Sequence, residues 1–126
     1  MLLCFAVSRC AVSPTGDRLY ITSINSYYQP TLLTLARDGT LLATFTDPAL
    51  GVPTGLHVTP AGQVLVCGRL SNTVLQVGWE GESKLATLAT QKDGVWWPLS
   101  VCYSSTTSSI IVGLLVDDNI LVFRVE

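Results

Sequence analysis

The sequence predicts an all-β protein built from short antiparallel strands, and three observations lead to this prediction. Between residues 53 and 88, four apolar segments of about five residues are separated by turn residues such as Pro60-Ala61-Gly62. The same pattern recurs on both sides of this stretch with a period of about 45 residues. No segment of useful length shows the apolar periodicity of an amphipathic helix. Together these features describe repeated small antiparallel sheets.

The first repeat spans residues 9–46 and contains four predicted strands. Val, Leu, Ile, Thr and aromatic residues dominate these strands, as expected where both faces of a sheet are covered. The segments Pro14-Thr15-Gly16 and Arg37-Asp38-Gly39 separate the first strand from the second and the third from the fourth, and both carry residues suited to tight turns. The predicted strands are residues 9–13, 18–22, 31–36 and 41–46.

The second repeat, residues 55–88, aligns with the first and is also complete. Residues 10–16 match residues 56–62, and residues 33–39 match residues 75–81. Its predicted strands are residues 55–59, 63–67, 73–77 and 84–88.

The third repeat, residues 100–126, is predicted to be incomplete. Residues 98–103 match residues 53–58, so the third repeat begins as the second does. Its predicted strands are residues 100–104, 109–113 and 119–125, and no fourth strand follows.

Length and composition are those of one well-packed domain. The chain has 126 residues, of which 48% are hydrophobic and only 13% charged, so disorder is excluded and a buried core is expected. The net charge of −2 lacks the basic excess that is typical of nucleic-acid-binding domains.

The cysteines indicate neither a metal site nor a disulfide framework. Cys4, Cys10, Cys67 and Cys102 stand far apart without a C-x-x-C pair, and His57 is the only histidine. A zinc site needs four clustered ligands, so we expect no metal and no cofactor. Reduced cysteines in apolar strands behave as small hydrophobic side chains, which favours a reducing compartment and a cytoplasmic location.

Two apolar stretches resemble membrane or targeting segments. Residues 94–116 are uncharged and long enough for a span, but Pro98 and the polar residues 104–109 are typical of a turn between strands. We therefore expect no membrane association. Residues 1–8 are apolar and end in small residues like a signal peptide, but they lack a basic start, so a truncated strand or leader is predicted.

Four-stranded sheets of about 45 residues cannot cover both of their faces alone, and they commonly stack radially as the blades of a β-propeller. The run P-T-G-L-H-V-T-P-A-G-Q-V-L-V-C followed by S-N-T-V-L-Q-V resembles the NHL repeat. The resemblance extends from about Arg9 to the C-terminus and departs from the usual pattern at residues 95–97 and 114–116, which are apolar where polar loop residues are usual. It implies about three four-stranded antiparallel blades, half of a six-bladed ring.

NHL repeats often form the C-terminal region of tripartite-motif ubiquitin ligases, so the resemblance implies a protein-interaction module that recruits substrates. No RING, B-box or coiled-coil segment is present in this sequence, and ligase activity itself is not carried over. Some family members bind single-stranded RNA, which is an alternative function.

We expect no enzymatic activity and assign no catalytic residue. Similar propellers of the lactonase and amidating-lyase types hold a metal on the central axis with carboxylate, Asn or His ligands. The three predicted inner strands supply His57 and no acidic residue, and no G-x-S-x-G motif occurs. A half-buried structural role is expected for His57. A fragment of a propeller hydrolase or lyase remains an alternative, because further blades could hold the ligands.

The predicted loops carry the candidate binding residues. In a propeller the loops between second and third strands share one rim with the connections between blades. Aromatic residues beside basic ones are typical of protein interfaces and also suit stacked RNA bases. Two basic residues on this rim stand against four acidic ones, which favours a protein or peptide partner. The alternative for the two tryptophans is packing between adjacent blades. The candidates are Tyr27, Tyr28, Arg69, Asn72, Lys92, Trp96 and Trp97.

The number of repeats predicts self-association. Propellers close with about four to eight blades, so an arc of fewer than three complete blades leaves the outward faces of its end blades uncovered. We therefore expect a homodimer that completes the ring, or aggregation. Residues 2–7 are a candidate for the missing outer strand of the third blade.

Overall fold

The computed structural model describes residues 6–24, 29–115 and 120–124, which form eleven strands in three antiparallel sheets and two 3₁₀ helices. The first sheet has the order β1-β2-β3-β4 and contains β1 (Ala6–Val12), β2 (Arg18–Ile24), β3 (Pro30–Ala36) and β4 (Leu41–Thr46). The second has the order β5-β6-β7-β8 and contains β5 (Pro53–Val58), β6 (Val64–Gly68), β7 (Thr73–Val77) and β8 (Lys84–Ala89). The third contains β9 (Pro98–Ser104), β10 (Ser109–Leu114) and β11 (Ile120–Arg124).

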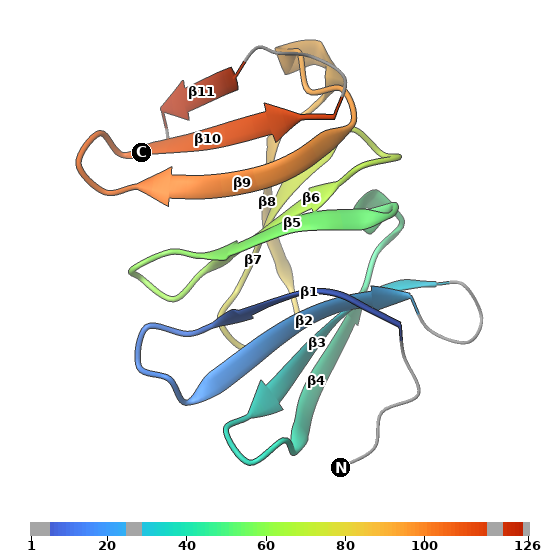
Figure 1. The fold of residues 1–126 in the computed structure, drawn as a ribbon, viewed down its shortest axis with the longest axis vertical. Helices are drawn as coiled ribbons and strands as arrows, with labels where there is room; N and C mark the ends of the chain where they lie inside the picture. Colours follow the sequence, from blue (N-terminus) through green and yellow to red (C-terminus); the bar gives the residue numbers. More distant parts are fainter. Residues whose placement is uncertain (1–5, 25–28, 116–119, 125–126) are drawn as a thin grey trace.

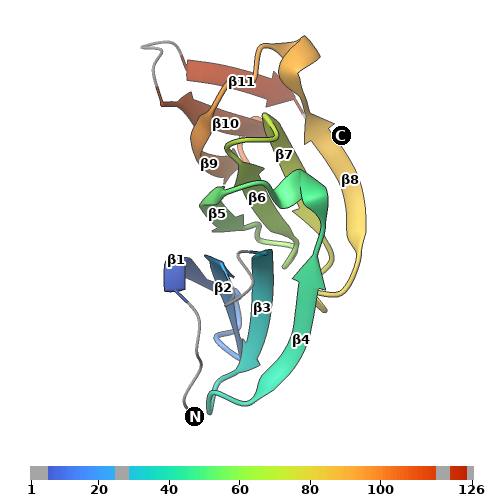
Figure 2. The same ribbon diagram turned by 90° about the vertical axis from the view of Figure 1, so that its right-hand side faces the viewer.

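The three sheets stack as blades around one axis, so the prediction of an all-β partial propeller is confirmed. The first strands β1, β5 and β9 lie next to one another, and β5 contacts both of its neighbours (Figure 1). The fourth strands β4 and β8 lie at the opposite edge, as Figure 2 shows from the side. The 3₁₀ helices η1 (Pro48–Leu50) and η2 (Gln91–Asp93) lie in the two connections between blades.

The first blade begins earlier than predicted. β1 starts at Ala6 rather than at residue 9, because Ala6 pairs with Ile24 and Val7 pairs with Ser23. These two residues are therefore part of the first sheet, and the idea that residues 2–7 supply the outer strand of the third blade is wrong for them. Residues 2–5 lie outside the described residues.

The core consists of the two junctions between blades, and β6 contributes to both. Val64 and Val66 face the first blade, while Leu65 and Cys67 face the third. All four side chains are at most 1% exposed. Successive side chains of a strand point to opposite faces, so a strand that is covered on both faces must be apolar at every position. Full burial of each of the valine and leucine side chains contributes about 1.5–3 kcal/mol.

The outward face of the third blade is uncovered by any other described residue. Ile120 and Val122 on β11 are 67% and 63% exposed, whereas Val74 on β7 of the second blade is fully buried. Within the described residues β11 pairs only with β10.

The turns and loops separate into two rims (Figure 1). One rim carries the turns between first and second and between third and fourth strands, and we call it the turn rim. The other carries the loop between β6 and β7 together with η1 and η2, and we call it the loop rim. None of the helices in the described part of the chain is long and apolar enough to cross a membrane.

Candidate binding surface on the loop rim

The loop after β6 is fastened to the connection that contains η1. The backbone N–H of Arg69 donates to the carbonyl oxygen of Val52 at 2.9 Å. The hydroxyl groups of Ser71 and Thr73 both donate to the carbonyl oxygen of Ala49, the second at 2.9 Å. This loop therefore has a defined position beside the connection between the first and second blades.

A capping box shapes the connection between the second and third blades. The Thr90 Oγ1 accepts a hydrogen bond from the backbone N–H of Lys92 at 3.3 Å, and the Thr90 N–H donates to Asp93 Oδ2 at 2.9 Å. Gly94 ends this turn in the left-handed conformation, with φ of 93°, which glycine adopts without steric cost. The exposed side chain of Lys92 therefore projects from an ordered backbone.

The two connections meet at Asn72 and Trp97. The Asn72 Oδ1 accepts a hydrogen bond from the backbone N–H of Trp97 at 2.8 Å, and the Trp97 carbonyl accepts one from the N–H of Leu115 at 2.9 Å. Asn72 and Trp97 have φ of 54° and 49°, in the left-handed region, which asparagine adopts readily but which costs a tryptophan about 1–2 kcal/mol. The hydrogen bond from the Trp97 N–H to Asn72 holds the backbone that carries the tryptophans.

The tryptophan side chains remain accessible on this backbone. Trp96 is 50% exposed and Trp97 is 45% exposed, although their neighbours Val95 and Pro98 are buried. The alternative that both tryptophans are core residues between blades therefore does not describe the structure.

A hollow of about 770 Å³ opens beside Trp96. Its lining combines one aromatic ring, the Lys92 ammonium group, the Gln91 amide and two hydroxyl groups. Such a lining places an aromatic ring, a positive charge and hydrogen-bonding groups close together on one part of the surface. The lining residues are Ser71, Thr90, Gln91, Lys92 and Trp96.

The structure brings together four of the seven candidates. Lys92 and Trp96 line the same hollow, and Asn72 is hydrogen-bonded to the backbone of Trp97. Arg69 is half-buried and lies on the side of the loop that contacts Val52. Tyr27 and Tyr28 lie outside the described residues.

Sequence reasoning missed Ser71, Thr90 and Gln91, all of which line the hollow. The T-x-x-D spacing from Thr90 to Asp93 is typical of a capping box, and it is the sequence signal that could have pointed to Thr90 and Gln91.

His57 lies on β5 and is half-buried, as expected for a structural residue. Burial lowers the pKa of His57, because a low-polarity environment disfavours the imidazolium form. Among the described residues no group of three or more His, Cys, Asp or Glu side chains could hold a metal ion. Burial raises the pKa of the Cys67 thiol to about 12, so this thiol is protonated and inert at neutral pH.

Comparison with solved structures supports the same class of fold. The chain is similar to hydrazine synthase of Kuenenia stuttgartiensis, with a TM-score of 0.77 and 14% identity over 98% of this chain and 47% of that one. It is also similar to virginiamycin B lyase of Staphylococcus aureus (TM-score 0.70, 15% identity, 97% of this chain and 42% of that one). A chain of the nidogen/laminin complex matches with a TM-score of 0.59 and 22% identity over 91% of this chain and 46% of that one.

These likenesses show the β-propeller fold, in agreement with the stacked four-stranded sheets. The chain spans less than half the length of each of these proteins. No family model matches the sequence, and no curated protein matches it.

Proposed function

We propose that this chain is a non-catalytic propeller module that binds a protein or peptide partner through the hollow beside Trp96. The observation that carries the proposal is the presentation of two half-exposed tryptophans on a backbone held by the Asn72–Trp97 hydrogen bond and by the capped turn at Thr90. Tryptophan is enriched among the residues that dominate binding energy at interfaces, and a rigid backbone reduces the entropy lost on binding.

The preferred partner segment carries an acidic residue next to an aromatic or large apolar one. Lys92 lines the hollow and is exposed, so a carboxylate of the partner can approach it, while the Trp96 ring offers a face for stacking. Recruitment of substrates to a tripartite-motif ubiquitin ligase is the more specific form of this proposal, and the NHL-like segments of the sequence support it.

Peptides selected from a random displayed library on the whole chain provide the test. Affinity is then measured by titration calorimetry against Trp96→Ala and Lys92→Glu. The matched control is Trp79→Ala, since Trp79 is also 50% exposed but lies on the turn rim. Loss of a dominant interface residue costs at least about 2 kcal/mol, so Trp96→Ala is expected to weaken binding about 30-fold or more.

Lys92→Glu should weaken the acidic peptides selectively, and Trp79→Ala should leave affinity unchanged. Selected peptides that bind Trp96→Ala as well as the original chain would refute the site. Binding of single-stranded oligonucleotides that falls steeply with salt and needs Trp96 would assign the surface to RNA instead.

A further inference from the structure

A shallow cavity of about 200 Å³ lies on the turn rim, at the junction between the first and second blades. Three turns surround it, those between β1 and β2, between β5 and β6 and between β7 and β8, and a backbone hydrogen bond closes each of them. The Tyr20 hydroxyl donates to the carbonyl oxygen of Trp79 at 2.7 Å and so joins the two blades at this point. The walls of the cavity are therefore ordered. The residues that decide its chemistry are Pro14, Asp17, Arg18, Pro60 and Trp79.

Arg18 contributes a guanidinium group whose donors the described residues leave unused. The group lies 4.4 Å from the centroid of the Trp79 ring, so stacking fixes its orientation. Among the described residues the Arg18 side chain makes no hydrogen bond and no ion pair. Glu80, which follows Trp79, lies against Gly78, where an added Cβ would meet the Glu80 Oε2 at 2.7 Å. A half-buried guanidinium with its donors available in a fixed plane is suited to a carboxylate ligand.

Asp17 contributes the opposite charge to the same cavity. The Ser13 hydroxyl donates to Asp17 Oδ1 at 2.8 Å, and the Thr15 hydroxyl donates to the same oxygen. The hydrogen bonds from Thr15 and Ser13 lower the pKa of Asp17, so its carboxylate is ionised at neutral pH. Asp17 and Arg18 are neighbours in the sequence, yet no ion pair joins them in the described part of the chain. Each charge is fixed by its own contacts and remains available to a ligand.

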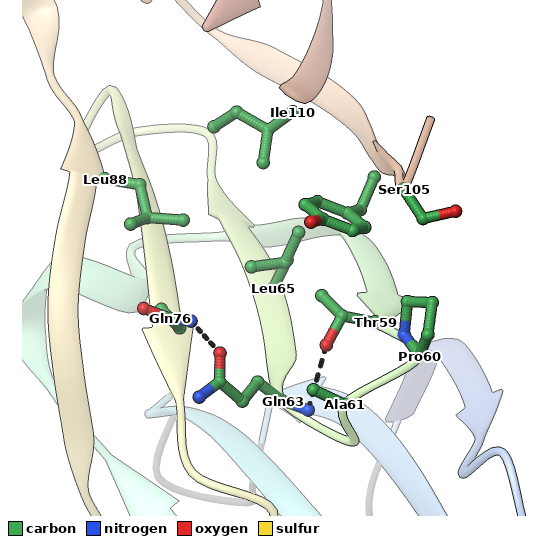
Figure 3. Close-up of a pocket in the computed structure, with 10 residues that line it drawn as sticks. Thr59, Pro60, Ala61, Gln63, Leu65, Gln76, Leu88, Ser105 and Ile110 are labelled. Carbon is green, nitrogen blue, oxygen red and sulfur yellow. Dashed lines mark hydrogen bonds between the residues drawn. The ribbon is translucent and has the colours of Figure 1, made fainter. Parts of the chain in front are cut away.

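The second junction lacks these charges at the corresponding positions. The N–H of Gln63 donates to the hydroxyl group of the preceding turn at 3.1 Å, as the N–H of Arg18 does, so Gln63 corresponds to Arg18. Its side chain accepts a hydrogen bond from the Gln76 amide nitrogen at the edge of a cavity of about 440 Å³ (Figure 3). Gly62 precedes Gln63 where Asp17 precedes Arg18. Two blades therefore pack together without such charges, and packing alone does not account for them.

We propose that the cavity beside Trp79 binds an α-amino acid with an apolar side chain. The carboxylate of the ligand accepts hydrogen bonds from the Arg18 guanidinium, and its ammonium group donates to the Asp17 carboxylate. The Trp79 ring, which is 50% exposed, and the two prolines of the lining contact its side chain. The cavity is smaller than the about 300–1,000 Å³ of sites for drug-sized ligands, which favours a molecule of this size. The site lies on the turn rim, apart from the loop-rim hollow at Trp96, and does not rest on the function proposed above.

The probe is L-leucine, added to the whole chain while nuclear magnetic resonance follows the indole N–H signals of the tryptophans. Trp79→Phe identifies the Trp79 signal by its loss. We expect leucine to shift the Trp79 signal and to leave those of Trp96 and Trp97 unchanged. The expected dissociation constant is about 1 mM, because ion pairs that are partly open to water contribute little.

Three relatives of leucine separate the contributions of its groups. Leucinamide lacks the carboxylate and 4-methylpentanoate lacks the ammonium group, and each should bind about five- to tenfold more weakly than leucine. Glycine keeps both charges without a side chain. It should also bind more weakly than leucine, because the Trp79 ring then gains no apolar contact.

Two variants link each charge of the ligand to one residue. Arg18→Gln introduces the side chain that the second blade has at this position, and it should weaken leucine about five- to tenfold without weakening leucinamide. Asp17→Asn should weaken leucine to a similar extent without weakening 4-methylpentanoate. The matched control is Asp38→Asn, because Asp38 is an exposed carboxylate in another turn of the same rim and does not line the cavity. It should bind every ligand as the original chain does.

The proposal makes a crossed pattern of losses, and each departure from it has one meaning. Equal affinities of leucine, leucinamide and 4-methylpentanoate for the original chain would overturn the proposal. Equal weakening of leucine and leucinamide by Arg18→Gln would overturn the pairing of the carboxylate with Arg18. A shift of the Trp96 or Trp97 signal in place of the Trp79 signal would put the amino acid on the loop rim. No shift of any indole signal at about ten times the expected dissociation constant would exclude the site altogether.

Discussion

Replacement of Gly81 by alanine should destabilise the protein more than the same change at Gly39. The two glycines occupy the same position in the turns that join third and fourth strands, since the N–H of Gly39 donates to Ala36 and the N–H of Gly81 donates to Gly78. Their φ angles are 92° and 76°, so alanine is strained at both. Gly39→Ala is therefore a matched control for the backbone part of the effect.

The surroundings differ between the two turns. A Cβ at Gly39 would meet nothing within 4 Å, whereas a Cβ at Gly81 would overlap Thr34 Oγ1 and lie 2.9 Å from the Thr34 Cβ. The backbone conformation costs alanine about 1–2 kcal/mol at either site. Overpacking against Thr34 adds about 1–3 kcal/mol at Gly81 alone. We expect about 1–2 kcal/mol of destabilisation for Gly39→Ala and about 2–5 kcal/mol for Gly81→Ala.

Urea unfolding followed by far-UV circular dichroism measures both values by linear extrapolation. Thr34→Ala in the Gly81→Ala background should recover part of the loss, because it removes the hydroxyl that the new methyl group overlaps. That hydroxyl is buried and has no hydrogen-bond partner, so its removal forfeits no hydrogen bond. Equal free energies of unfolding for the two glycine variants, or strictly additive effects of Gly81→Ala and Thr34→Ala, would refute the reasoning.

Three further predictions concern titration, reactivity and assembly. Because burial lowers the pKa of His57, the unfolded state binds more protons near the ordinary pKa of 6.5, so the free energy of unfolding should fall as the pH drops through and below 6.5. His57→Gln should flatten this dependence, and the same dependence of stability on pH in the variant and the original chain would contradict the prediction. Iodoacetamide at pH 8 should alkylate the exposed Cys10 and Cys102 but should spare Cys67, whose pKa is about 12, until the protein unfolds. Detection of alkylated Cys67 in the folded protein by mass spectrometry would disprove this. Sedimentation velocity should show self-association through the uncovered outward face of the third blade, and Val122→Lys should reduce this self-association. A monodisperse monomer of 13.5 kDa at all concentrations would refute the prediction.

Strand positions could be predicted from the sequence because strand formation in a repeat depends on local patterns. The segments around β6 and β7 alternate between two buried faces, and turn residues such as Gly62 and Gly81 end them, so their bounds were predicted within a residue. The start of β1 was predicted late, because residues 6–8 carry no turn signal before residue 9 and their pairing with β2 is a tertiary feature.

The sequence predicts which residues lie on the loop rim, but not which of them contact one another. Alternating hairpins place Asn72 and Trp97 on one rim, but nothing in the sequence pairs a side-chain amide with a backbone N–H 25 residues away. The same holds for Ser71, which lines the hollow and whose hydroxyl donates to the carbonyl oxygen of Ala49 in another connection.

The sequence by itself determined the all-β class, the four-strand repeat and the order of strands within each blade. These features follow from a two-residue alternation and from turn chemistry, which act over a few neighbouring residues. Only the tertiary structure decided that Trp96 is half-exposed, that Tyr20 bonds to Trp79 across 59 positions, and that the second junction retains a larger cavity than the first. Contacts between blades depend on the shapes of side chains that meet only after the sheets have stacked, so no local pattern encodes them.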